Sequence, residues 1–167
     1  MQKNIIFISQ KNDEYLKNLN EECYVLDATL DEDFCREFMV LAQKKDIVVL
    51  FVGENAVECA KKFGADGVVC EASDKGVKSQ VEDLRKILGK KAIVGLVARN
   101  RRHEAMVVSE AEPDFVVFKV WSDGIEKTKE LLEWYSDFFL IQSVAWVIDE
   151  DVEKSTLMAD FIMNNGK

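Results

Sequence analysis

Residues 46–51 read Asp-Ile-Val-Val-Leu-Phe, an aspartate directly followed by a continuous apolar run. The unit recurs at Asp66-Gly-Val-Val-Cys, Asp114-Phe-Val-Val-Phe, Asp137-Phe-Phe-Leu-Ile and Asp160-Phe-Ile-Met. The aspartates are 20, 48, 23 and 23 residues apart, and Ala92-Ile-Val-Gly-Leu-Val fills the one double gap. Such runs, without polar alternation, are typical of strands in parallel sheets, where both faces are covered.

Between the runs, the apolar residues change to a helical spacing. Ala56, Cys59, Ala60 and Phe63 fall at i, i+3, i+4 and i+7, which predicts one buried helix face. Similar stripes are Phe34, Phe38, Leu41 and Ala42, then Val77, Val81, Leu84 and Leu88, then Ile125, Leu132 and Tyr135. The chain therefore alternates strands with helices that cover the sheet.

The strand candidates number eight when Ile5–Ser9 and Cys23–Asp27 are added at the front. They begin near residues 4, 23, 46, 66, 91, 114, 138 and 159. Strict alternation predicts a compact (β/α)₈ TIM-type barrel with shortened helices, a thin seventh helix at 152–157 and no eighth helix. The alternative is an open doubly wound parallel sheet of five or six strands. In either case we expect residues 1–167 to form a single domain.

The net charge and the cysteine spacing argue against several classes of partner and of site. The net charge of −9 argues against a nucleic-acid backbone or an anionic membrane as partner. The four cysteines contain no C-x-x-C pair, which argues against a zinc knuckle or a redox pair and favours reduced thiols. Ile5–Ile8 is too short for a signal sequence, and the apolar stretch 138–148 is too short to span a membrane. We expect a cytoplasmic protein.

The middle of the chain resembles the thiamine phosphate synthase/TenI family, most clearly over residues 46–120. The matching segments, in order, are Gly64-Ala-Asp-Gly-Val-Val, Leu84-Arg-Lys-Ile-Leu-Gly, Ala92-Ile-Val-Gly, Glu104-Ala and Pro113-Asp-Phe-Val-Val-Phe. The resemblance implies a (β/α)₈ barrel and a role in thiamine biosynthesis. In that family, a pyrimidine diphosphate is joined to a thiazole phosphate with Mg²⁺, or, in the TenI branch, a thiazole carboxylate tautomer is the substrate.

The resemblance also implies a magnesium site after the third and fourth strands. Asp74 falls on one family Mg²⁺ ligand, and counting back from Gly64 places Glu54 and Asn55 near the other. From the residues alone, Glu54, Glu71 and Asp74 could offer oxygen ligands to Mg²⁺. Alternatively, these acids are stabilised at helix N-termini by the helix dipole.

Other positions depart from the family. At the end of strand two the family has Gln, Arg and Lys for the diphosphate, whereas this chain has Val25-Leu-Asp-Ala-Thr. The family's Gly-Gly phosphate turn at strand seven corresponds to Gln142-Ser143, and the Lys-containing loop after strand six is reduced to Lys119-Val-Trp. We therefore expect little or no synthase activity, and the sequence identifies no catalytic residue.

A positive cluster at residues 99–103 offers a phosphate site. Arginine forks and helix N-terminal amides suit phosphate oxygens. The residues predicted to bind phosphate are Arg99, Asn100, Arg102, Lys119 and Ser143. The alternatives are a solvated turn, or a rim whose cations pair with acidic neighbours. His103 has no Ser or Cys partner at a catalytic spacing.

Two alternative functions remain open. One is a non-catalytic module that binds a phosphorylated metabolite or a protein. The other is a receiver-like regulatory domain, although Ser9-Gln10 stands where such domains have paired acids. The apolar run Val144–Ile148, with Trp146 at its centre, suggests a plug in the barrel or, preferably, a contact between subunits of a homo-oligomer. The strand-entry aspartates are expected at the rim opposite the ligand site, as structural caps.

Overall fold

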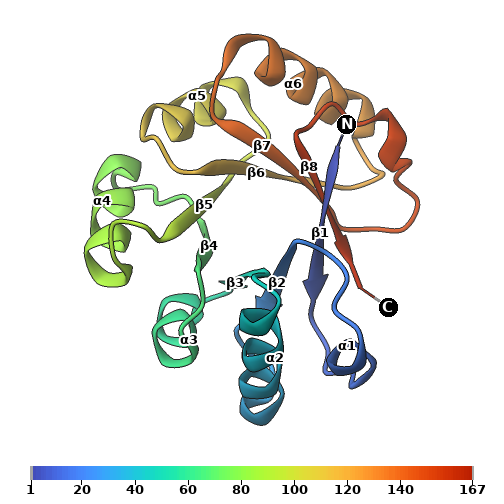
Figure 1. The fold of residues 1–167 in the computed structure, drawn as a ribbon. Coiled ribbons are helices and arrows are strands. Elements are labelled where there is room, and N and C mark those ends of the chain that lie inside the picture. Colours follow the sequence, from blue (N-terminus) through green and yellow to red (C-terminus); the bar gives the residue numbers. More distant parts are fainter. Residues whose placement is uncertain (1, 167) are drawn as a thin grey trace.

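The strands of the protein close into a parallel barrel in chain order (Figure 1). The structure is a computed structural model that describes residues 2–166. The strands are β1 (Lys3–Ile8), β2 (Cys23–Asp27), β3 (Val48–Val52), β4 (Gly67–Glu71), β5 (Ile93–Ala98), β6 (Phe115–Val120), β7 (Gln142–Val147) and β8 (Phe161–Asn165). Since β1 pairs with both β2 and β8, the barrel prediction is confirmed. The open-sheet alternative is wrong, and with it the receiver-like one.

The helices lie outside the barrel (Figure 1). They are α1 (Glu14–Lys17), α2 (Glu32–Lys44), α3 (Ala56–Phe63), α4 (Val77–Leu88), α5 (Arg102–Glu110) and α6 (Ile125–Phe138). The seventh helix expected at 152–157 is only a 3₁₀ turn, η1 (Lys154–Thr156). No helix within residues 2–166 is both long and apolar enough to cross a bilayer.

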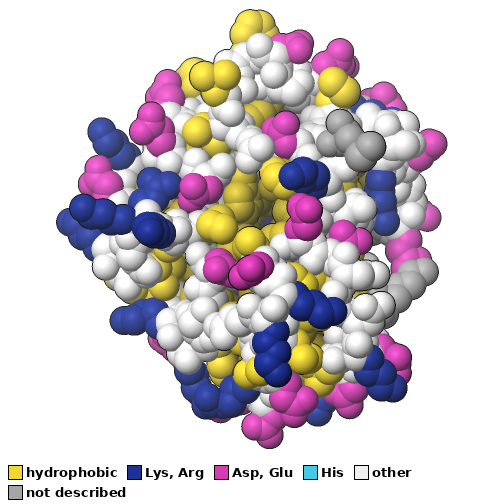
Figure 2. Space-filling model, viewed as in Figure 1, with side chains coloured by type: hydrophobic (Ala, Val, Ile, Leu, Met, Phe, Trp, Pro, Cys, Tyr) yellow, Lys and Arg dark blue, Asp and Glu magenta, His cyan; other side chains and the backbone are white. Residues whose placement is uncertain are grey.

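Alternating strand residues build two hydrophobic layers. Side chains such as Val68 and Phe118 point outward and pack under the helices. Their neighbours Val69 and Val117 point inward and fill the barrel. Figure 2 shows one face of the molecule, with apolar side chains at its centre and acidic and basic side chains interspersed around them.

The repeated aspartates connect neighbouring strands at the amino-terminal rim. Carboxylate Oδ2 atoms of Asp66, Asp114 and Asp160 accept hydrogen bonds from backbone N–H groups at 2.8, 2.7 and 2.9 Å. The donors are Val49, Val94 and Ser143, each the second residue of the preceding strand. The expected structural role is thus observed, with a partner on another strand rather than in the local turn.

The seventh strand begins four residues later than expected. Asp137 and Phe138 belong to α6, whose hydrogen bonding continues through Phe139 N–H to the Tyr135 carbonyl at 3.0 Å. The strand starts at Gln142, so Ser143 lies at the amino-terminal end of β7. The Val144–Val147 part of the run expected to contact another subunit is buried within this protein, Val144 and Trp146 in the inner layer and Ala145 and Val147 in the outer one.

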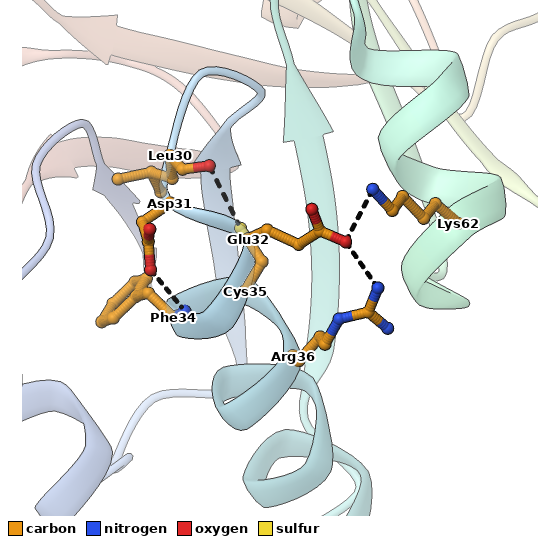
Figure 3. Close-up of polar contacts among 7 residues, drawn as sticks. All are labelled: Leu30, Asp31, Glu32, Phe34, Cys35, Arg36 and Lys62. Carbon is orange, nitrogen blue, oxygen red and sulfur yellow. Dashed lines mark hydrogen bonds and ion pairs between the residues drawn. The ribbon is translucent and has the colours of Figure 1, made fainter.

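One ion-pair group joins two of the outer helices (Figure 3). The Glu32 carboxylate at the start of α2 receives Arg36 Nη2 at 2.5 Å and Lys62 Nζ of α3 at 2.7 Å. The Lys62 hydrogen bond, followed by that of Arg36, lowers the pKa of Glu32. Both cations also lie 5.5 Å from the ring centre of Phe63. The group orients α2 against α3 and lies outside the barrel.

Candidate functional site

The carboxyl-terminal mouth of the barrel contains a cavity of about 460 Å³. In parallel barrels this rim carries the ligand site. The cavity is lined by Phe7 of β1, Asp27 of β2, Val52 to Glu54 after β3, Val69 to Glu71 of β4, Val97 of β5, Lys119 of β6 and Trp146 of β7. Its wall is apolar, with charged side chains supplied by the strand ends.

Lys119 forms the central polar contact of the mouth. Its Nζ donates to Glu71 Oε1 at 2.8 Å and lies 5.3 Å from the ring centre of Trp146. Lys119 and Trp146 are register partners on β6 and β7, which explains why ammonium and indole meet. The ammonium is therefore held between a carboxylate and an aromatic ring.

The aromatic pair beneath this cation is tightly packed. Trp146 is 8% exposed and meets Phe7 edge-on, with ring centres 5.1 Å apart. The Trp146 Nε1–H group is buried and has no hydrogen-bond acceptor within residues 2–166. A buried donor without an acceptor is costly, so this indole is an unusual feature of the mouth.

Asp27 adds a fixed carboxylate to the cavity, whereas the side chain of the neighbouring Cys70 packs in the outer hydrophobic layer. Asp27 Oδ1 accepts hydrogen bonds from the Thr29 N–H at 2.9 Å and the Thr29 hydroxyl at 2.7 Å, which fix the carboxylate. Burial, followed by the charge of Glu71, raises the pKa of the Cys70 thiol. Cys70 is therefore protonated at neutral pH and is not poised as a nucleophile.

The predicted phosphate residues are only partly brought together. Arg99, Asn100 and Lys119 line a second cavity, of about 300 Å³, beside the mouth. Asn100 Nδ2 donates to the Lys119 carbonyl at 2.8 Å. Arg102 instead stacks 5.2 Å from the ring centre of Trp134 on α6, and Ser143 lies at the opposite rim. Phosphate binding stays a prediction for the first three residues.

Two carboxylates form ion pairs with Arg99, the arginine of that cavity. Arg99 Nη2 lies 3.3 Å from Asp74 Oδ1, and Arg99 Nη1 lies 3.6 Å from Glu104 Oε1. These three side chains line a further cavity between α4 and α5. A phosphate would have to compete with two carboxylates for this guanidinium.

The predicted magnesium residues do not converge. Glu54 and Glu71 line the mouth, Asp74 lies with Arg99, and Asn55 immediately precedes α3. No three His, Cys, Asp or Glu side chains within residues 2–166 gather into a group that could hold a metal ion. Since the carboxylates of Glu71 and Asp74 are both paired with cations, this arrangement does not fit a preformed Mg²⁺ site.

Phe7 is a mouth residue that sequence reasoning missed. It lies within β1 rather than after it, so a search limited to strand-exit residues passed over it. Phe7 could have been found from strand alternation, because Ile5 and Phe7 share the inward face of β1.

Comparison with known proteins supports the family resemblance. No family model matches the chain. It is 36% identical over 105 residues to the thiamine-phosphate synthase of Erythrobacter litoralis, covering 58% of this chain and 47% of the relative. It is 33% identical over 111 residues to the Hyphomonas neptunium thiamine-phosphate synthase, covering 63% of this chain and 48% of the relative. The resemblance to thiamine phosphate synthase is confirmed. The chain spans about half the length of these curated relatives.

Solved structures share the barrel fold of this protein. The thiamine phosphate pyrophosphorylase of Pyrococcus furiosus superposes with a TM-score of 0.67 at 16% identity, covering 98% of this chain and 85% of that protein. An HpcH/HpaI aldolase from Desulfitobacterium hafniense also reaches 0.67, at 10% identity, over 99% of this chain and 87% of the other. At these identities, the superpositions support the barrel alone.

Proposed function

We propose that this protein is a cytoplasmic, ligand-binding relative of thiamine-phosphate synthase that has little or no synthase activity. The observation that carries the proposal is the charge of the mouth. Asp27, Glu54 and Glu71 line the cavity, and the cation among its described lining residues, Lys119, is already paired with Glu71. Four free cysteines are in keeping with a reducing compartment.

A diphosphate substrate needs cations that this mouth does not offer. Phosphate oxygens are held mainly by charge-assisted hydrogen bonds from Arg, Lys or bound metal ions. Here Arg99 is engaged by Asp74 and Glu104, and three carboxylates would repel the ligand. Mg²⁺ binding by Asp74 and Glu71 would first require both ion pairs to break.

The second candidate function is non-catalytic binding of a phosphorylated metabolite. It is favoured by the cavity that Arg99, Asn100 and Lys119 line together. In this case the phosphate would displace Asp74 from Arg99, and the affinity would depend on the phosphate group. No turnover is expected from either function.

The test is a synthase assay with the pyrimidine diphosphate, the thiazole phosphate and Mg²⁺, followed by chromatography of the products. We expect no thiamine phosphate from this protein, while the Erythrobacter litoralis relative serves as the positive control. Calorimetry with each substrate, with and without Mg²⁺, measures binding separately.

Product formation that requires Mg²⁺ and disappears in Asp74→Ala would overturn the proposal. The matched control is Asp137→Ala, because Asp137 lies at the far end of α6 and outside the mouth. Both variants remove one exposed carboxylate, so a loss restricted to Asp74→Ala cannot come from net charge alone.

A further inference from the structure

We infer that Asn165 is a site of spontaneous deamidation, and that the reaction is coupled to opening of the seam at which β8 pairs with β1 and closes the barrel. Asn165 is the last residue of β8 and is followed by Gly166, which makes the one Asn-Gly step in the sequence. The reaction needs no ligand, metal ion or enzyme, so the inference is independent of the proposed function.

The backbone nitrogen of Gly166 is the nucleophile of this reaction. After losing its proton to water, it attacks the side-chain carbonyl carbon of Asn165, whose bond to Nδ2 breaks, and Nδ2 takes up a proton and leaves as ammonia. Water then opens the succinimide ring at one of its two carbonyl carbons. Attack at the side-chain carbon gives aspartate, and attack at the backbone carbon gives isoaspartate. Glycine favours the ring closure because it has no side chain to hinder the approach.

The structure explains why a glycine stands at position 166. A Cβ there would overlap the hydroxyl group and ring of Tyr15, and would also lie 2.9 Å from Ile6 Cγ2. The half-buried Tyr15 ring is held edge-on to Tyr24, with ring centres 6.4 Å apart. In Figure 1 the end of β8 accordingly lies beside α1. Packing of α1 on the seam therefore requires the residue that makes Asn165 susceptible.

The closed seam opposes the reaction. The Gly166 N–H donates to the Phe7 carbonyl at 2.9 Å, and Asn165 is the register partner of Phe7. The nitrogen has to leave this acceptor before it can turn towards the Asn165 carboxamide. Because the Asn165 side chain is itself exposed, the backbone contact is the barrier rather than lack of water. Deamidation thus requires local opening of the seam.

Local opening is favoured at this seam, because little of the outer cover holds it. Helix α1 has four residues and buries no side chain, and η1, which precedes β8, has three residues and buries none. Segments with few buried apolar contacts open at a free energy well below that of global unfolding. The end of β8 is therefore expected to leave β1 while the rest of the barrel stays folded.

The product disfavours closure of the seam. Isoaspartate adds one carbon atom to the main chain opposite Phe7, so the Gly166 N–H no longer meets the Phe7 carbonyl. Either product also adds a carboxylate to a cavity of about 380 Å³ that Asn165 lines together with Asp149, Glu150 and Lys154. Like charges in one cavity repel each other. The modification is irreversible and accumulates with the age of the molecule.

Peptide mass spectrometry of the full chain, incubated at neutral pH with and without denaturing urea, tests the coupling. Product should accumulate at Asn165 about ten- to a thousandfold more slowly in the folded protein than in urea. Asn100 is the internal reference, because it is exposed but is followed by Arg101 and should stay intact. Equal rates in the two conditions would overturn the inference. Protection as strong as that of the β6 amides in hydrogen exchange would overturn it too, because opening would then be global.

The Tyr15→Ala variant tests the role of α1. Without the ring over Gly166, deamidation of the folded protein should be several-fold faster, while the rate in urea is unchanged. The control is Lys17→Ala, which removes an exposed side chain of the same helix that pairs with Glu14 at 3.2 Å. Equal rates in the two variants would contradict the role of Tyr15. If circular dichroism shows that Tyr15→Ala is unfolded, wild type in urea below its unfolding transition replaces it, and a constant rate there refutes local opening.

Two substitutions at Asn165 itself test the consequence for the seam. Asn165→Asp carries the added carboxylate from the start, whereas Asn165→Gln keeps an amide that closes the five-membered ring no longer. Hydrogen exchange in β1 should be faster in Asn165→Asp than in Asn165→Gln, and prolonged incubation should speed exchange in wild type but not in Asn165→Gln. Identical exchange in β1 before and after deamidation would refute the loosening of the seam.

Discussion

Three aspartate carboxylates at the amino-terminal rim are structural. Each accepts a hydrogen bond from a backbone N–H group at the start of a neighbouring strand. Asp114 accepts from Val94 and also lies 3.4 Å from Arg85 Nη2. Asp66 and Asp160 repeat the backbone contact on β3 and β7. At these three positions the recurring Asp is therefore explained by strand-to-strand hydrogen bonding rather than by chemistry at the mouth.

Replacing Asp114 with Ala should lower the free energy of unfolding by about 1 to 3 kcal/mol, since the Val94 N–H loses its acceptor. Urea denaturation measures the loss. Asp137→Ala is the control, because this exposed helix residue has no such backbone contact, and its effect should stay within about 0.5 kcal/mol. Equal losses in the two variants would contradict the assigned role.

The buried Cys35 thiol of α2 (Figure 3) is expected to make the free energy of unfolding depend on pH. Burial, with smaller contributions from Cys59, Asp31 and Glu32, raises its pKa from 9.0 to about 11. Between these pH values, the unfolded chain has released the thiol proton while the folded chain keeps it. The unfolded state then binds fewer protons, so stability falls as pH rises through this window.

The Cys35→Ala variant isolates this effect. The difference in unfolding free energy between wild type and variant should be constant below pH 9 and should shrink as the pH approaches about 11. Denaturant titrations at several pH values give both curves. Parallel curves across the window would show that the buried thiol does not contribute.

Strands of this barrel approach so closely that two of them need glycine. A Cβ at Gly67 of β4 would overlap the backbone of Ile93 on β5, and one at Gly95 of β5 would overlap the Phe115 ring on β6. Both positions face the barrel interior, where Phe115 uses the space above Gly95. The interior is thus filled by one large ring opposite a residue without a side chain.

The Gly67→Ala substitution should destabilise the protein more than Gly95→Ala, because backbone yields less readily than a ring. Overpacking of this kind costs about 1 to 3 kcal/mol. Thermal and urea unfolding give the ranking, and Phe115→Leu should partly restore the stability of Gly95→Ala by vacating the ring position. If the double variant is no better than the single one, the clash is not with Phe115.

At the scale of the molecule, the apolar runs and helical stripes were enough to predict a barrel of eight strands. The error at Asp137-Phe-Phe-Leu-Ile arose because this segment has the composition of a strand entry, while Tyr135 and Phe139 stack at 4.8 Å and continue the helix end. The rim that carries the site was also predictable, since strand ends locate it. Pairing of the arginine cluster with acidic neighbours was one of the predicted alternatives and is observed for Arg99. The individual partners, Glu71 for Lys119 and Asp74 for Arg99, were not predictable, because they lie 48 and 25 residues away along the chain.

The outer helical cover is uneven around the barrel. Helices α1 and η1 have four and three residues and bury no side chain, whereas α6 has fourteen residues and buries Leu131, Leu132 and Tyr135. Both short elements flank the region where β8 meets β1. Hydrogen exchange followed by mass spectrometry should be fastest in peptides from 9–22 and 149–160, and slowest in β6 and β7. Faster exchange in β6 than in these segments would contradict the order.

The pairing of β1 with β8 also has a consequence for synthesis on the ribosome. On one side β1 pairs with its neighbour β2, but on the other side Lys3 to Phe7 pair with Phe161 to Asn165 of β8, which is synthesised after the other seven strands. Until β8 has been made, the polypeptide has seven strands and two edges whose backbone N–H and C=O groups are unpaired. Such edges can pair with strands of other nascent chains. Pairing of β8 with β1, rather than formation of any single βα unit, is therefore the step that removes the exposed strand edges of this protein.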